Sequence, residues 1–259
     1  MQIKIGSTLY IGGSSKYQLS PNIQGLECPA IRVGDGLYAG KDGGYVSGHF
    51  YGHRTIIIPG FYIGSDCDEA DGLRKLLFGF MRIRYRLPIC IRDFSDNYYF
   101  TEGYVTSVKA SITNPVSGDF QLTLLCPDPN LYYIDNFSAV TPKYFETNLR
   151  STTTISNEGN VDAYPIITIT GIVHDVTIEN TTTLQTMEIE ITTTNATDVL
   201  MINMDKRVIT LNGDVINANR STDSSWWYLL PENNEIALTF GNGSSATAKL
   251  KYKKGYVGI

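Results

Sequence analysis

The chain of 259 residues holds 21 Lys and Arg against 26 Asp and Glu, which gives a formal net charge of −5. An acidic balance argues against a nucleic-acid-binding protein, whose electrostatic footprint is a strongly basic face. No run approaches the ~18–20 consecutive apolar residues of a membrane span, so no membrane contact is predicted. No long apolar run follows Met1, so we expect synthesis in a cytoplasm without a secretory signal. The length leaves room for one or two domains, each able to bury a core.

Strand patterns dominate the first half of the chain. Short runs rich in β-branched and aromatic residues, bounded by Gly, Pro and Asn, are typical of half-buried strands. They predict strands at Gln2–Ile5, Leu9–Ile11, Ile56–Ile58, Arg82–Leu87, Tyr98–Val108 and Phe120–Leu125. Between Gly43 and Leu77 an alternating strand-like segment runs through a Gly-containing turn into a second strand, and a helix follows.

The helix is predicted to begin near Ser65 or Asp66, since either side chain can cap it. Apolar residues then recur at spacings of three and four and define one face of the helix. They are Leu73, Leu76, Leu77 and Phe80. Gly72 and Gly79 each weaken the helix by up to ~1 kcal/mol relative to Ala, so we expect packing on a sheet to hold it.

A change of composition divides the chain near residue 140. Residues 129–150 mix aromatic residues with Asp, Asn, Pro and Ser, which is typical of a linker. We therefore predict domains at 1–140 and 141–259. Beyond the linker, seven short strands at regular spacing predict a β-sandwich, and the fold class is mainly β with one helix. These strands are Ile166–Ile172, Val176–Asn180, Met187–Ile191, Val199–Asn203, Arg207–Leu211, Glu235–Phe240 and Ala246–Tyr252, with a two-residue hairpin turn at Asn212-Gly213.

The sequence offers little that predicts catalysis, a cofactor or a metal site. A loose dinucleotide pattern at residues 34–39 is followed by a loop and not by the helix that the mechanism requires. His49 and His53 are spaced as ligands on a helix would be, but their segment alternates like a strand. The carboxylates between Asp66 and Asp71 lack the spacing of a calcium loop, and a helix N-terminus explains them. We predict no enzyme activity, no cofactor and no metal.

The cysteines do not suggest a metal or disulfide framework. Cys28, Cys67, Cys90 and Cys126 form no C-x-x-C pair, and free thiols that are mostly buried are expected.

Two groups of residues are candidates for contact with a partner. Arg82, Arg84 and Arg86 share one face of their predicted strand, which is either a solvated face or a row that pairs with carboxylates of a neighbouring subunit. In the segment after Gly43, which carries no sign of a reaction centre, Tyr45, His49 and Tyr51 complete the candidate interface.

The aromatic cluster Trp226-Trp227-Tyr228 allows a different functional interpretation, which is glycan binding. An exposed indole can stack on a sugar ring, although such residues are more often core or interface anchors. Since Trp226 and Trp227 point to opposite sides of an extended chain, we expect one to be buried and one exposed.

Three places resemble the distal tail proteins of siphophages. The first leads from Asp42-Gly43-Gly44-Tyr45 through Arg54–Phe61 into the helix with Leu73-Arg74-Lys75-Leu76. The second runs from Tyr98-Tyr99 through Gly118-Asp119-Phe120 to Cys126-Pro127-Asp128-Pro129. The third joins Ser225-Trp226, Leu230-Pro231 and Ile236 to the terminal strand at Lys251–Tyr256. There the family has Gly where Glu232 stands, and Asn233 or Asn234 is expected to take the positive φ of the turn.

The resemblance implies a structural hub in a virion tail tip, assembled in the cytoplasm of the host bacterium. The first domain would be sandwich-like, with one helix and an extended Gly-rich arm at residues 20–48, and would form a homohexameric ring. The second would be similar to galectins and carbohydrate-binding modules. The tail tube protein would bind one side of the ring, a tail-associated fibre or lysin protein the other, and receptor-binding proteins the rim. The alternative is a carbohydrate-binding protein that recognises a cell-surface glycan with Trp226 or Trp227.

Overall fold

The computed structural model describes residues 1–259, except for the side chain of His49. The chain divides into two compact units. The first unit is Met1–Pro142 with Tyr256–Ile259, and the second unit is Lys143–Gly255. The sequence predicts the last four residues in the second domain, but they return to the first unit. There Ile259 N–H donates to Leu26 C=O, and Arg54 donates to Val257 C=O.

The first unit is built on one antiparallel sheet, whose main path is β2-β1-β7-β8-β9-β6-β3. The 13-residue strand β8 belongs to both halves of this sheet, which pack around one core in the predicted sandwich-like arrangement. Its first half pairs with β7, its second half pairs with β9, and a bulge between Val105 and Ser107 bends it between the two. The strands of this sheet are β1 (Gln2–Ile5), β2 (Leu9–Ile11), β3 (Tyr17–Leu19), β6 (Arg54–Ile63), β7 (Leu87–Arg92), β8 (Tyr98–Ala110), β9 (Ser117–Cys126), β10 (Leu131–Tyr133) and β21 (Gly255–Tyr256).

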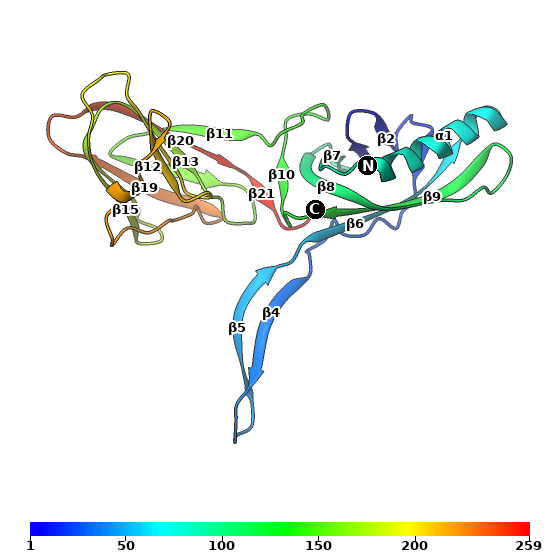
Figure 1. Ribbon diagram of the computed structural model, residues 1–259, viewed down its shortest axis with the longest axis horizontal. Helices are drawn as coiled ribbons and strands as arrows, with labels where there is room; N and C mark the ends of the chain where they lie inside the picture. Colours follow the sequence, from blue (N-terminus) through cyan, green and yellow to red (C-terminus); the bar gives the residue numbers. More distant parts are fainter. The chain divides into compact units, whose positions relative to one another are not determined.

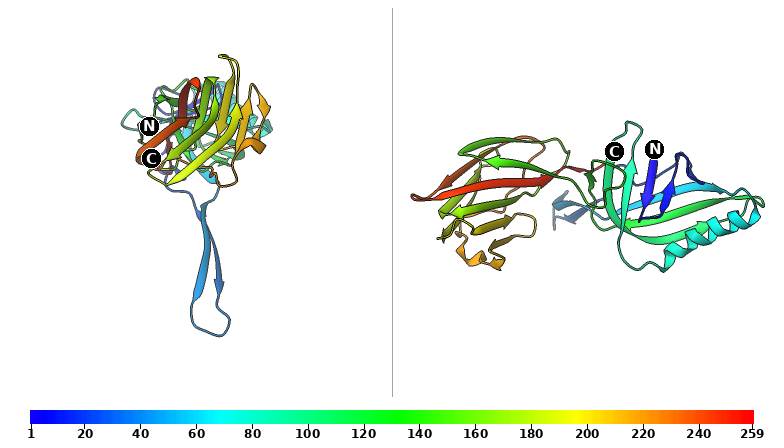
Figure 2. Two further views of the ribbon diagram at one scale, coloured as in Figure 1. Left: turned by 90° about the vertical axis from the view of Figure 1, so that its left-hand side faces the viewer. Right: turned by 90° about the horizontal axis from the view of Figure 1, so that it is seen from above.

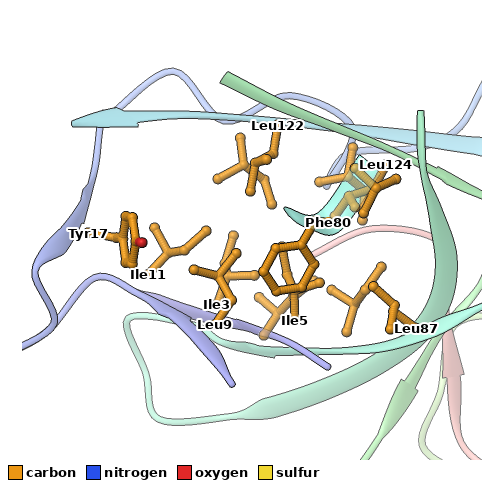
Figure 3. Packing of buried hydrophobic residues seen from close by; sticks show 14 of the residues in the cluster. Ile3, Ile5, Leu9, Ile11, Tyr17, Phe80, Leu87, Leu122 and Leu124 are labelled. Carbon is orange, nitrogen blue, oxygen red and sulfur yellow. The ribbon is translucent and has the colours of Figure 1, made fainter. Parts of the chain in front are cut away.

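Helix α1 (Cys67–Gly79) lies on this sheet and closes its core. Asp66 is the N-cap, and its carboxylate accepts from Glu69 N–H at 2.8 Å. Of the predicted apolar face, Leu77 is buried and Leu73 is half-buried, but Leu76 is exposed. Figure 3 shows the core that α1 helps to cover, where side chains from several strands converge on Phe80. They include Ile3, Ile5, Leu9, Ile11, Leu87, Leu122 and Leu124.

The predicted strand at Arg82–Leu87 is wrong. After α1 the chain continues as a 3₁₀ turn, η1 (Phe80–Arg82), and β7 begins only at Leu87. The turn forms because Phe80 is drawn into the core, and its C=O then accepts from Ile83 N–H. Arg82 ends η1, and Arg84 and Arg86 lie in the loop that follows. All three are exposed, and they do not share a strand face.

The predicted Gly-rich arm is a two-stranded ribbon of the first unit. Strands β4 (Ile31–Leu37) and β5 (Gly44–Tyr51) pair with each other and with no other described strand. Figure 1 shows them leaving the sheet as an isolated ribbon. We call residues 31–51 the arm.

The second unit is a sandwich of two antiparallel sheets around one core, as predicted. One sheet has the order β11-β20-β13-β16-β17-β18 and the other β12-β19-β14-β15; Figure 2 shows the two layers. The elements are β11 (Tyr144–Leu149), β12 (Thr152–Asn157), β13 (Ile166–Ile172), β14 (His174–Asn180), β15 (Gln185–Thr192), β16 (Val199–Asn203), β17 (Val208–Leu211), β18 (Asp214–Val215), η2 (Asn217–Asn219), β19 (Glu232–Phe240) and β20 (Ser245–Lys253).

Two local predictions in the second unit have opposite outcomes. The hairpin at Asn212-Gly213 is confirmed, since both residues have positive φ (51° and 97°) and Leu211 pairs with Asp214. The linker prediction is wrong for Tyr144–Leu149, which is an edge strand paired with β20. The mainly β class with one α-helix is confirmed for the described residues.

Candidate functional site

The arm exposes apolar side chains that a free monomer would be expected to bury. Leu37 is 87% exposed, Val46 70% and Phe50 68%. Exposed apolar side chains gathered on one two-stranded element indicate a protein interaction site. The outer edges of β4 and β5 also carry backbone groups that no described strand pairs. The arm is therefore the candidate interaction site of this chain.

Glycines allow the two arm strands to pair closely. A Cβ on Gly34 would lie 2.6 Å from the carbonyl oxygen of Ser47, and one on Gly36 would lie 2.6 Å from the Tyr45 ring. Opposite the bulge between Val33 and Gly34, Gly48 has a φ of 77°. These positions need Gly because the partner strand occupies the space that a side chain would fill.

The arm residues named from the sequence have different outcomes. Tyr45 is exposed and packs at 5.9 Å from the Tyr38 ring, over which the Lys41 ammonium lies at 4.1 Å. Tyr51 lies at the base of the arm, paired with Ile31. The side chain of His49 lies outside the described residues. Tyr45 and Tyr51 are thus on the arm, and their role in an interface stays a prediction.

The three arginines lie outside the arm strands, with Arg82 at the end of η1 and Arg84 and Arg86 in the loop before β7. None of the three forms an ion pair with a described residue of the chain. Their guanidinium groups are therefore available to a carboxylate of a partner, although the regular row expected from a strand is absent.

The carboxylates at the start of α1 cap and stabilise the helix. Glu69 accepts from Ser65 N–H at 2.7 Å and pairs with Lys16, and hydrogen bonds from Lys16 and Ser65 lower the pKa of Glu69 to about 2. Asp71 pairs with Lys75 at 2.5 Å, one helical turn away. Among the described residues, no group of three His, Cys, Asp or Glu side chains could hold a metal ion.

The remaining chemical candidates are also placed by the structure. The loose dinucleotide pattern lies along β4, and a second strand follows it. Cys28 and Cys67 are exposed and Cys90 and Cys126 are buried, all as free thiols, so the thiols are less buried than expected. Burial raises the pKa of Cys126 to about 11, which keeps it a neutral thiol.

The two tryptophans differ in burial, although neither is fully exposed. Trp227 is fully buried in the core of the second unit, so it has no ring face to offer a glycan. Trp226 is half-buried, and the Arg220 guanidinium lies 5.8 Å from its ring centroid. Of the two candidates for glycan contact, only Trp226 reaches the surface.

One exposed aromatic residue was not singled out from the sequence. Phe94, in the turn between β7 and β8, is 88% exposed and borders a groove of about 560 Å³ in the first unit, with Leu19, Ile23 and Leu26 on its walls. The available signal is an aromatic side chain inside an otherwise polar turn, Asp93-Phe94-Ser95-Asp96-Asn97.

Two β units and an unpartnered β arm are typical of a structural subunit. Comparisons with known proteins show which structural proteins this chain is similar to. Residues 158–256 match the family model of the siphovirus-type tail component, C-terminal domain. The fold of the whole chain is similar to the crystal structure of the SPP1 Dit protein, with a TM-score of 0.71 and 16% identity over 93% of both chains. The C-terminal part is therefore similar to the siphovirus-type tail component domain, and the resemblance to siphophage distal tail proteins is confirmed.

The other comparisons carry no further argument about the family or fold of this chain. A chain of the phage P2 baseplate matches with 10% identity over 100% of this chain and 99% of that one, but its TM-score of 0.44 is too low to support an argument. No curated protein matches the sequence. Within the described residues, no helix has the length and apolarity to cross a membrane.

Proposed function

We propose that this chain is a structural subunit of the tail tip of a siphophage, where copies of its first unit form a hub ring. The observation that carries the proposal is the arm, a ribbon with exposed apolar side chains on a chain whose residues 158–256 match a tail component domain. The SPP1 protein is described as a paradigm of the hub adsorption apparatus in phages that infect Gram-positive bacteria, and its fold supports the same role here.

The arm suggests how the ring closes. Each arm contacts the next subunit. The arm of one subunit and the surface that binds it on the next are different surfaces, so the contact is heterologous, and repeating it around a rotation axis closes a ring. Six copies complete the ring. Docking then covers the apolar side chains of Val46 and Phe50 and pairs the free backbone edges of β4 and β5.

The ring leaves two faces and a rim for other tail proteins. The tail tube protein binds one face and a tail-associated fibre or lysin protein binds the other, while the second units carry receptor-binding proteins or decorate the rim. The role is structural and uses no catalysis and no cofactor. The second unit is similar in build to galectins and carbohydrate-binding modules. The glycan-binding alternative is less favoured because Trp227 is buried.

Immunoelectron microscopy of the virions tests the proposal. Gold-labelled antibody raised against the second unit is expected to mark the tail end distal to the capsid. Label on the capsid, along the tube, or nowhere on intact virions would contradict the proposed place of the protein. Antibody against the major capsid protein serves as the control for specific labelling.

A further inference from the structure

We infer that Arg54 positions the arm for ring assembly by clamping the arm's root to the C-terminal tail of the chain. The assembly part of this inference rests on the proposed function. The clamp itself does not, because it can be measured on a monomer. We call residues 24–30 the root and residues 257–259 the tail.

Arg54 is the first residue of β6, three positions after the arm ends, and it is only 1% exposed. Its Nε donates to Pro129 C=O at 2.8 Å. Its Nη1 donates to Gly25 C=O at 2.6 Å and to Glu27 C=O at 2.8 Å, and its Nη2 donates to Val257 C=O at 2.6 Å. One guanidinium thus joins the root, the tail and the segment that follows β9.

This charge is buried without a carboxylate partner among its hydrogen bonds. Burial lowers the pKa of Arg54, and Glu27, the nearest acidic residue of the root, turns its carboxylate to Gly25 N–H at 2.9 Å. Burying a charge costs desolvation free energy, which the four hydrogen bonds to carbonyl groups offset. The distinctive property of arginine is a rigid fork of five donors, which fixes several acceptors in one geometry.

The root is held tightly at the same place. Gly25 has a φ of 85°, and a Cβ there would lie 1.9 Å from Thr55 C=O, so the root passes directly over β6. Ile259 N–H donates to Leu26 C=O at 3.0 Å, which pairs the tail with the root on its other side. Arg54 lies where these segments meet.

The arm strands have no neighbouring strand in the described chain. They pair only with each other, and the base of the arm is closed by Gly52 N–H donating to Ala30 C=O at 2.7 Å. The direction in which the arm leaves the first unit therefore depends on the root. Gln24 anchors the start of the root to Ile57 of β6 by two backbone hydrogen bonds of 3.0 Å, and Arg54 holds the part of the root that is nearer to the arm. A ring forms only when each arm meets the next subunit at the right angle.

Hydrogen exchange on the full chain tests the clamp. R54K keeps the positive charge but cannot reach four carbonyl groups, so the amides of the root and of Ile259 should exchange about tenfold faster. Amides of β7 and β8, which Arg54 does not touch, should be unchanged and show that the sheet is intact. R92K is the matched control, since Arg92 ends a strand of the same sheet but bonds at the surface to Asp96. Unchanged exchange at the root in R54K would overturn the inference.

A second variant approaches the clamp from the tail. A Cβ on Gly258 would lie 3.2 Å from the backbone nitrogen of Cys28 and from the carbonyl carbon of Glu27, so G258V should push the tail off the root. If Arg54 and the tail act as one device, G258V should loosen the root like R54K, and the double variant should add little. Independent, additive effects would contradict the clamp.

The assembly readout separates the inference from the proposed function. If the wild-type chain forms a ring, R54K should fail to do so at the concentrations at which wild type and R92K assemble. A ring in R54K with a loosened root would show that the clamp does not position the arm. If the wild-type chain forms no ring, the proposed function fails, while the exchange results still decide whether the clamp exists.

Discussion

At the scale of single residues, the turn before β19 shows how a polar side chain decides which residue takes a positive φ. The expectation that Asn233 or Asn234 does so is wrong, because Glu232 has a φ of 75°. Asn234 is fully buried, where its Oδ1 accepts from Leu230 N–H at 2.9 Å and its Nδ2 donates to Leu230 C=O at 2.8 Å. These bonds hold Asn234 in extended backbone, and the positive φ falls on Glu232, the first residue of the strand.

Replacing Glu232 should therefore stabilise the second unit. Glu232→Gly removes the steric cost of a left-handed backbone and is expected to raise the free energy of unfolding by about 1 kcal/mol. Thermal unfolding followed by circular dichroism checks this. Glu146→Gly, at an exposed position inside β11 without positive φ, is the control and should lower the melting temperature. A lower melting temperature for Glu232→Gly would contradict the strain argument.

Replacing Trp227 and Trp226 one at a time should show that Trp227 stabilises the core of the second unit far more than Trp226 does. Trp227→Ala empties a buried site and should cost about 3–5 kcal/mol in unfolding free energy, whereas Trp226→Ala should cost clearly less. Trp227→Phe should be milder than Trp227→Ala, since it keeps a ring and removes an indole N–H that has no hydrogen-bond partner. Chemical denaturation of the three variants measures this order, and equal losses for Trp226→Ala and Trp227→Ala would contradict it.

At the scale of elements, the sequence predicts those whose pattern depends on their own residues. Gln2–Ile5, Leu9–Ile11 and Ile166–Ile172 are found with the predicted bounds, because alternation and turn residues are local signals. Prediction failed at Arg82–Leu87, where burial of Phe80 favours a 3₁₀ turn over the alternating pattern. It failed at Tyr144–Leu149 because this edge strand is polar on its exposed face, and its sequence therefore resembles that of a linker.

The start of α1 should give the first unit a stability that depends on pH. Hydrogen bonds from Lys16 and Ser65 lower the pKa of Glu69 from 4.5 to about 2. A carboxylate with a lowered pKa stabilises the folded state above its unfolded pKa and loses that contribution as the pH falls through the folded pKa. Wild type should therefore lose its advantage over Glu69→Gln between pH 4.5 and 2. Denaturant midpoints of both proteins across this range test it, and a difference that stays constant would contradict the pairing.

At the scale of the whole molecule, the proposed function requires the arm to contact a second chain. Its Gly-rich composition was readable from the sequence, but its pairing and its direction were not. Val46 and Phe50 are exposed, and under the proposed function the side chains that cover them belong to another subunit, so no periodicity within this chain reports them. For the same reason the interface roles of Tyr45, Tyr51 and the three arginines remain predictions.

A charge placed on the arm should weaken assembly without unfolding the chain. Val46→Lys puts an ammonium group into the surface that docking buries, and desolvation of that charge opposes the contact. The variant should melt like wild type but need a higher concentration to assemble, as measured by analytical ultracentrifugation. Leu184→Lys changes a side chain of the second unit that is 82% exposed, and it should assemble like wild type. Equal weakening by both changes would show that the effect is not specific to the arm.

The mass of the protein in solution tests the central claim most directly. Light scattering on a size-exclusion column, over a range of concentrations, should show a species of six 28.7 kDa chains for the wild type. A variant in which Asn-Gly replaces residues 33–49 should remain a single folded chain, because Arg32 and Phe50 already face each other across the arm. A wild-type chain that stays monomeric at every concentration, with no difference from the shortened variant, would contradict the account.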